Sequence, residues 1–120
     1  RAWTREEAER VTAAIRGYSP VDPGVSLSVE SGFDRPPLEP TVASDALFET
    51  ARRLAGDLGL ELGAARVGGA SDGNLTAAAG IPTLDGLGPC GGGAHARDEH
   101  VLVADLPIRA ALLAALVSEA

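Results

Sequence analysis

The chain has 120 residues, of which 45% are apolar but only 3% aromatic, and its formal net charge is −7. This length fits one modest domain or part of a larger protein, and the core must be built from aliphatic side chains. The negative charge argues against nucleic acid and anionic membranes as partners, because both attract basic patches. A single cysteine excludes an intramolecular disulfide, so we expect a cytoplasmic protein. The sequence contains no methionine, and we therefore expect a fragment of a longer protein.

The first thirty residues are typical of a helix followed by a strand. Thr4 and Glu7 have the spacing of a capping box at the start of a helix. An apolar stripe follows at helical spacing, through Ala8, Val11, Ile15 and Tyr18. Residues 25–30 then alternate apolar and polar side chains, which predicts a half-buried strand of an antiparallel sheet. We expect the neighbouring strands of that sheet to lie upstream of this chain.

The pattern changes after a proline-rich stretch, residues 32–40, which indicates a crossing between two domains. Beyond it we expect a helix from Ser44 to Gly59, one from Asp72 to Ala79, and one starting at Asp105. Short strands are expected between these helices, at residues 64–67, 81–84 and 101–104. Strands that alternate with helices indicate an α/β fold with a mainly parallel sheet. The last helix is apolar nearly all round, so we expect it to be buried.

His95 follows three consecutive glycines, residues 91–93, in a loop before the last predicted strand. An imidazole in such a loop can ligate a metal ion, act as a general base or simply cap a turn, and an isolated histidine is more often structural. Loops at strand ends in open α/β sheets bind ligands, which favours a functional role for His95. Zinc requires three or four protein ligands, so His95 alone does not make a metal site.

Two further candidates lie outside that loop. Ser71 or Asp72 can cap the helix that follows; alternatively, its N-terminus, with the Ser71 hydroxyl and the Asn74 amide, can hold an anionic group. Asp72 would repel an anion, so we assign it a supporting role. Arg35 is either a solvated, salt-bridged residue or, placed over a cleft, a clamp for a carboxylate.

Two other classes of site are disfavoured. The glycine-rich stretches contain neither GxxxxGK[ST] nor a convincing GxGxxG between a strand and a helix, which argues against a nucleotide site. The sequence also lacks the GxSxG elbow of a serine hydrolase, which argues against a catalytic triad.

Three motifs in order resemble the C-terminal part of M20-family metallopeptidases, which include glutamate carboxypeptidases, succinyl-diaminopimelate desuccinylases and acetylornithine deacetylases. They are GGASDGN at 68–74, GIPTLDGLGP at 80–89 and GGGAHARDE at 91–99, with GFDRPP at 32–37 upstream. The resemblance spans essentially the whole chain but only the last third or so of a family member. It implies a two-domain enzyme, with an α/β catalytic domain that binds two zinc ions and a smaller α+β lid that forms a homodimer. Residues 1–35 would be the last helix and strand of the lid, and residues 36–120 the C-terminal part of the catalytic domain.

The resemblance also implies roles for individual residues. His95 matches a zinc ligand, Arg35 matches the arginine that binds the substrate carboxylate, and Ser71, Asp72 and Asn74 match the loop that lines the substrate pocket. The reaction would be hydrolysis of the amide bond of an N-acyl amino acid or of a C-terminal residue. The other zinc ligands and the glutamate base would lie upstream, so no catalytic residue is expected in this chain.

We therefore expect the chain to be inactive by itself, as a fragment of a zinc-dependent amidohydrolase or exopeptidase. The alternative is a non-catalytic module that binds a small anion or serves in assembly, because no complete catalytic set is present in these residues.

Overall fold

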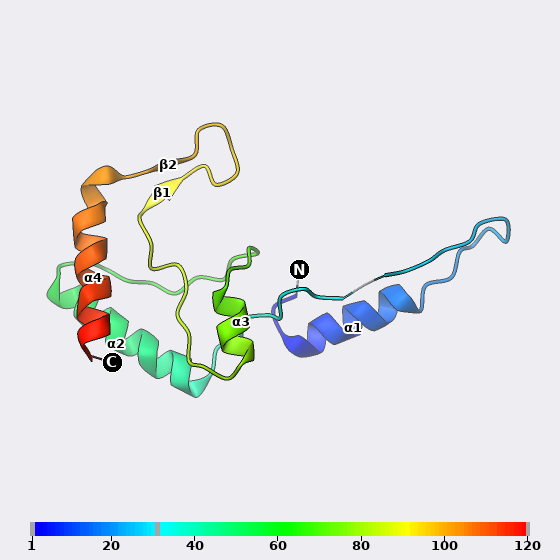
Figure 1. The fold of residues 1–120 in the computed structure, drawn as a ribbon, viewed down its shortest axis with the longest axis horizontal. Helices are drawn as coiled ribbons and strands as arrows, with labels where there is room; N and C mark the ends of the chain where they lie inside the picture. Colours follow the sequence, from blue (N-terminus) through cyan, green and yellow to red (C-terminus); the bar gives the residue numbers. More distant parts are fainter. Residues whose placement is uncertain (1, 31, 120) are drawn as a thin grey trace. The chain divides into compact units, whose positions relative to one another are not determined.

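The computed structural model describes residues 2–30 and 32–119 (Figure 1). Its elements in chain order are α1 (Arg5–Arg16), α2 (Val42–Asp57), α3 (Gly73–Ala78), β1 (Gly91–Gly92), β2 (His100–Val101), the 3-10 turn η1 (Val103–Asp105) and α4 (Leu106–Glu119). The chain forms two compact units. Unit 1 comprises Arg1–Pro40 and Val67–Thr83, and unit 2 comprises Thr41–Arg66 and Leu84–Ala120. This grouping differs from the boundary at residue 35 expected for the complete protein, which stays a prediction.

In unit 1, the start of α1 agrees with the sequence prediction. The backbone N–H of Glu7 donates to the Thr4 hydroxyl oxygen at 3.1 Å, so Thr4 caps the helix. The Glu7 carboxylate accepts from the backbone N–H of Trp3 at 2.9 Å, one residue before the cap. Two otherwise unsatisfied donors at this helix end are therefore paired locally.

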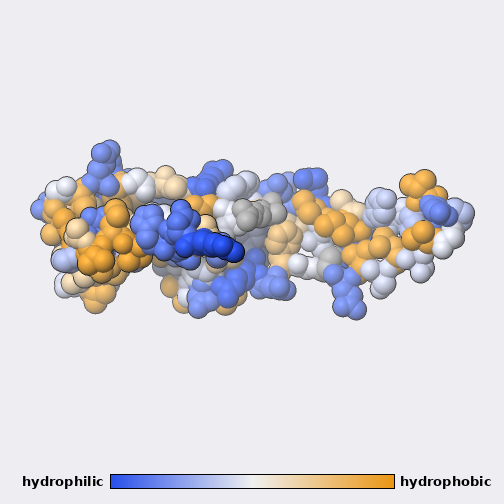
Figure 2. All heavy atoms as spheres, turned by 90° about the horizontal axis from the view of Figure 1, so that it is seen from above, coloured by the Kyte–Doolittle hydropathy of each residue, from blue (hydrophilic) through white to orange (hydrophobic). Residues whose placement is uncertain are grey.

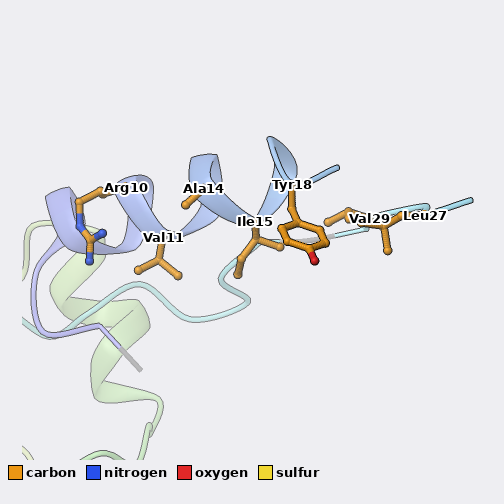
Figure 3. A pocket seen from close by; sticks show the side chains of 7 residues that line it. All are labelled: Arg10, Val11, Ala14, Ile15, Tyr18, Leu27 and Val29. Atoms are coloured by element: carbon orange, nitrogen blue, oxygen red, sulfur yellow. The ribbon is translucent and has the colours of Figure 1, made fainter. Parts of the chain in front are cut away.

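The strand predicted at residues 25–30 is not formed in the described structure. Leu27 and Val29 instead line an open apolar groove together with Val11, Ile15 and Tyr18 of α1 (Figure 3). Two apolar positions of the alternating pattern, 27 and 29, thus line the groove beside α1. The strand itself was wrong because a strand requires a hydrogen-bonded neighbour, and the described residues supply none for this segment.

In unit 2, the residue that caps α2 lies three positions before the predicted cap, Ser44. Thr41 is the capping residue, and its hydroxyl accepts from the backbone N–H of Ser44 at 3.1 Å. The Ser44 hydroxyl accepts in return from the backbone N–H of Thr41 at 2.7 Å. Ser44 is thus the second partner of a capping box, not the cap. Gly59, which we expected to end this helix, has the left-handed backbone typical of that position, with φ of 75°.

The core of unit 2 lies between α2 and α4, where Leu54, Ala55 and Leu112 are buried. Arg53 of α2 also pairs with Glu119 of α4, at 2.7 Å between Nη2 and Oε2. The prediction that the last helix is buried was wrong for much of its surface, since Val117 is 78% exposed and Leu113 42%. Within the described chain, α2 covers only one side of α4, so the remaining apolar side chains face solvent.

The mainly parallel sheet is not found among the described residues. The sheet there has two antiparallel strands, with Gly91 opposite Val101 and Gly92 opposite His100. The segments 64–67 and 81–84 form no strand, and residues 103–105 form η1 in place of the end of a strand. Helices with a small sheet are compatible with the α/β class, but the prediction of a mainly parallel sheet was wrong for the described residues. Parallel strands depend on neighbours distant in sequence, which a local pattern does not identify.

Apolar side chains remain exposed in both units. Hydrophobic residues, in orange, are interspersed with hydrophilic ones, in blue, over the face shown in Figure 2. In unit 1 the large exposed side chains include Ile15, Tyr18 and Leu27, and in unit 2 Val103 and Val117. Among residues 2–30 and 32–119, no helix has both the length and the apolar character that crossing a bilayer requires.

Gly56 allows a simple test of α2. It lies in the last turns of the helix, and a Cβ added there would meet nothing within 4 Å. We expect Gly56→Ala to raise the free energy of unfolding by about 0.5 kcal/mol, because alanine restricts the unfolded chain and favours the helix. Thermal unfolding measures this gain, and a lower melting temperature would contradict the packing described around α2.

Candidate functional site

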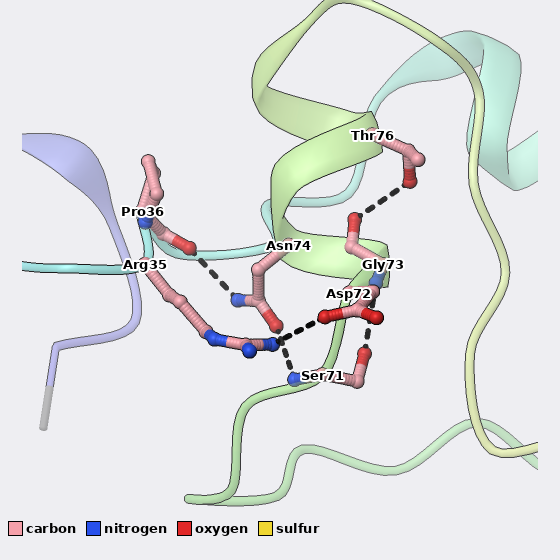
Figure 4. Close-up of polar contacts among 7 residues, drawn as sticks. All are labelled: Arg35, Pro36, Ser71, Asp72, Gly73, Asn74 and Thr76. Carbon is pink, nitrogen blue, oxygen red and sulfur yellow. Dashed lines mark hydrogen bonds and ion pairs between the residues drawn. The ribbon is translucent and has the colours of Figure 1, made fainter.

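The predicted site residues fall into two groups. Arg35, Ser71, Asp72 and Asn74 lie in unit 1 and are brought together, whereas His95 lies in unit 2. The first group joins two segments 37 residues apart in sequence through one ion pair (Figure 4).

The turn from Ser71 to Asn74 is held by its own side chains. The Ser71 hydroxyl accepts from the backbone N–H of Gly73 at 3.0 Å, and the Asn74 Oδ1 accepts from the backbone N–H of Ser71 at 2.9 Å. A Cβ at Gly73 would lie 3.1 Å from the Ser71 Oγ and 3.4 Å from side-chain carbons of Leu38 and Thr83, so the turn is tightly packed. Ser71 therefore caps the first amide of α3, as one of the two interpretations of the sequence held. The Asp72 side chain makes no such cap.

Asn74 connects this turn to the proline-rich segment. Its side-chain amide donates from Nδ2 to the backbone carbonyl of Pro36 at 2.8 Å. The residue is only 9% exposed, although it is polar. Both ends of the amide group are thus paired in the interior of unit 1, as buried polar groups require.

Arg35 and Asp72 form an ion pair at the surface of the same turn. The Nη1 of Arg35 donates to the Oδ1 of Asp72 at 2.9 Å, and the two side chains are 41% and 88% exposed. At this exposure the pair contributes about 0–1 kcal/mol to stability. Asp72 therefore faces a cation, and its supporting role stays a prediction. Substrate binding by these residues stays a prediction.

His95 lies in the loop that joins β1 to β2. The backbone N–H of Ala96 donates to the carbonyl of Gly93 at 2.8 Å, and that of Glu99 donates to the carbonyl of Ala96 at 3.3 Å. His95 itself has a left-handed backbone with φ of 66°, as does Gly93 with φ of 69°. Histidine adopts this conformation more often than most residues do, but at some cost. In the part of the chain that the structure describes, the exposed imidazole of His95 makes no hydrogen bond or ion pair.

The second histidine is engaged differently. His100 is exposed at the start of β2, and its Nδ1 lies 2.9 Å from the carbonyl oxygen of Asp98. The position of His100 also explains two of the glycines. A Cβ at Gly91 would overlap the His100 carbonyl, and one at Gly92 would lie 3.3 Å from the His100 ring. These glycines are needed for the close pairing of the hairpin, a role that sequence reasoning did not assign.

Arg109 was also missed from the sequence. Its Nε donates to the carbonyl of Gly88 at 2.9 Å and its Nη2 to that of Gly86 at 3.3 Å. These contacts attach the loop that precedes β1 to α4. The signal in the sequence is an arginine within the apolar stretch that begins α4, since a guanidinium there needs acceptors nearby.

The motifs that carry these contacts also match a known family. The family model described as peptidase family M20/M25/M40 matches residues 5–119. The chain belongs to this family. No curated protein and no solved structure matches the chain. Membership identifies a peptidase or hydrolase, and peptidases of this family are generally metal-dependent, usually on zinc.

The M20 chain supplies only part of what a zinc ion needs. His95 is accessible and its ring is unengaged, so it suits one position in a metal coordination sphere. Among the described residues, however, no three His, Cys, Asp or Glu side chains gather so that they could hold a metal ion. The described residues do not by themselves build a zinc site.

Proposed function

We propose that this chain is part of a zinc-dependent amidohydrolase or exopeptidase that cleaves the amide bond of an N-acyl amino acid or of a C-terminal residue. The observation that carries the proposal is the match to peptidase family M20/M25/M40 over residues 5–119. In this proposal His95 is one zinc ligand, and the remaining ligands and the general base come from residues outside the chain. The chain alone is then inactive, while the complete protein is a homodimer in the cytoplasm.

The geometry of unit 1 supports Arg35 as the group that binds the substrate carboxylate. A guanidinium carries five N–H donors, and Asp72 occupies only Nη1. Among the described residues, Nε and Nη2 of Arg35 have no partner, and this edge suits a bidentate carboxylate. The 41% exposure of the side chain leaves the edge accessible to a ligand.

The homodimer is supported by the groove of unit 1. Its apolar side chains from α1 and residues 25–29 remain exposed, with Tyr18 at 62% and Leu27 at 48%. Exposed apolar patches of this kind mark contact surfaces.

Arg35→Gln in the complete protein tests the carboxylate assignment. We expect kcat/KM for an N-acyl amino acid to fall about 10- to 30-fold, the lower part of the range for a hydrogen bond to a charged group, because Arg35 is partly exposed. For the same compound with its carboxylate replaced by a carboxamide, kcat/KM should be nearly unchanged. Steady-state kinetics with both compounds measures the difference.

A matched control is Arg52→Gln, which removes an arginine paired with Glu49 on the surface of α2. It should leave both substrates unaffected. Equal effects of Arg35→Gln on the two compounds would contradict the assignment. A zinc-loaded complete protein that binds acyl amino acids but hydrolyses none would instead favour the non-catalytic anion-binding module.

A further inference from the structure

We propose that Asn74 is a positioning residue, which fixes the backbone that carries Arg35 and so sets the preference for substrates with a carboxylate. The inference rests on the proposed function of Arg35. It gives Asn74 a role in place of the direct substrate contact that its motif implies.

The first argument is that the polar atoms of Asn74 are engaged with the protein. Oδ1 accepts from the backbone N–H of Ser71 at 2.9 Å, and Nδ2 donates to the carbonyl of Pro36 at 2.8 Å (Figure 4). With 9% exposure, little of the residue is accessible to a ligand. A substrate group would have to break one of these hydrogen bonds in order to reach the amide.

The second argument concerns the segment that Asn74 holds. Residues 36 and 37 are both prolines, so neither has a backbone N–H with which to anchor itself. In the chain just after Arg35, the carbonyl of Pro36 is therefore the first backbone group that can form a hydrogen bond with another segment. Proline at 36 also restricts the backbone of Arg35 to extended conformations. The hydrogen bond from Asn74 therefore fixes the position of the backbone next to Arg35.

The third argument is that the same turn also contacts the side chain of Arg35. Asp72, two residues before Asn74, accepts from Nη1 of Arg35 at 2.9 Å. The turn from Ser71 to Asn74 therefore holds Arg35 at two points, the backbone next to it and one end of its guanidinium. Two fixed points orient the Nε and Nη2 edge, which a single flexible ion pair would not do. This orientation favours a planar carboxylate over a neutral group.

Asparagine is the side chain that meets these needs at position 74. It provides an acceptor for Ser71 and a donor for Pro36 on one short planar group. Aspartate has the same size and keeps the acceptor but has no donor, so it would place a negative oxygen against the Pro36 carbonyl. Asn74→Asp is thus the variant that removes the link to Pro36 and keeps the link to Ser71.

The test uses the complete protein and the two substrates above, the N-acyl amino acid and its carboxamide. For Asn74→Asp we expect KM for the carboxylate substrate to rise roughly 3- to 10-fold, as one hydrogen bond predicts, with kcat nearly unchanged. KM for the carboxamide should not rise. In the Arg35→Gln background, Asn74→Asp should have no further effect, because the two residues act through one contact with the substrate.

The control is Thr76→Ala in α3. The Thr76 hydroxyl donates to the carbonyl of Gly73 at 3.0 Å, and its oxygen lies 2.9 Å from the hydroxyl oxygen of Thr83. This variant therefore disturbs the same helix but leaves the hydrogen bond to Pro36 intact. It should change neither KM. If Asn74→Asp does not fold, as thermal unfolding would show, Asn74→Ser takes its place with the same expected kinetics.

Three outcomes would overturn the inference. Equal changes for both substrates in the Asn74 variants would show a general structural role. Arg35→Gln could impair the carboxylate substrate more than the carboxamide while the Asn74 variants affect neither selectively. That result would contradict the inference about Asn74 and leave the proposed function of Arg35 unchanged. No discrimination by Arg35→Gln would remove the carboxylate role of Arg35 and the inference with it.

Discussion

Replacing His95 with alanine in the complete protein should remove bound zinc and lower kcat/KM by at least about 100-fold. Loss of a residue that only supports a metal ligand already costs about 10- to 100-fold in metal affinity or activity, and a direct ligand should cost no less. His95 suits this role because its ring is exposed and unengaged among the described residues, on a loop whose shape is set by turns at Gly93 and Ala96. Metal analysis of the purified protein, together with steady-state kinetics, measures both effects.

The controls separate loss of the imidazole from damage to the loop. His95 has φ of 66°, so His95→Gly relieves backbone strain while removing the ring and should lose zinc without loss of stability. His100→Ala removes the other histidine, whose Nδ1 already contacts the Asp98 carbonyl, and should retain zinc. Undiminished zinc and activity in His95→Ala would show that His95 is not a ligand.

The helices were largely predictable because their signals are local. The cap of α1 at Thr4 is read from residues within one turn, and the left-handed Gly59 follows α2 as expected. The start of α2 was misplaced because Thr41 and Ser44 cap each other, and only the structure shows which of them lies outside the helix. Local patterns thus identify a helix but leave its first residue open by about a turn.

The strands were poorly predictable because pairing is not local. Residues 25–30, 64–67 and 81–84 have strand-like composition but find no neighbour among the described residues. The hairpin that does form pairs Gly91 and Gly92 with His100 and Val101, and two glycines give no strand signal. Its cause is steric, since side chains at these positions would meet His100.

The site shows the same division between local and distant information. The motif offered Ser71 or Asp72 as the cap of the helix that follows, and the structure shows that Ser71 caps it. The hydrogen bond from Asn74 to Pro36 joins residues 38 positions apart, and neither segment alone contains a pattern that predicts it. The motif therefore indicates which residues matter, while the structure suggests which of them touch a ligand and which hold those that do.

Gly93→Ala should destabilise the hairpin that carries His95 by about 2–5 kcal/mol. Two costs combine in this estimate, about 1–2 kcal/mol for a side chain with a left-handed backbone and about 1–3 kcal/mol for overpacking. Gly93 has φ of 69°, and an added Cβ would lie 2.9 Å from the Asp98 carbonyl oxygen and 3.0 Å from the Glu99 nitrogen. These neighbours are backbone atoms, so they move only if the turn opens.

Hydrogen exchange of the loop amides, with zinc content as a second measurement, tests this expectation in the complete protein. The amides of Ala96 and Glu99, which are bonded within the loop, should exchange faster in Gly93→Ala. Gly88→Ala is the matched control, because Gly88 precedes the same hairpin and a Cβ there meets nothing within 4 Å. If both variants kept wild-type exchange and zinc, the tight turn at Gly93 would not be what holds His95 in place. Gly93→Ala could instead be the only variant to lose zinc, with an overall melting temperature near that of Gly88→Ala. The effect would then be confined to the hairpin, and its geometry would be what holds His95 in position. His95 is the only side chain of this hairpin that is proposed to bind the ion.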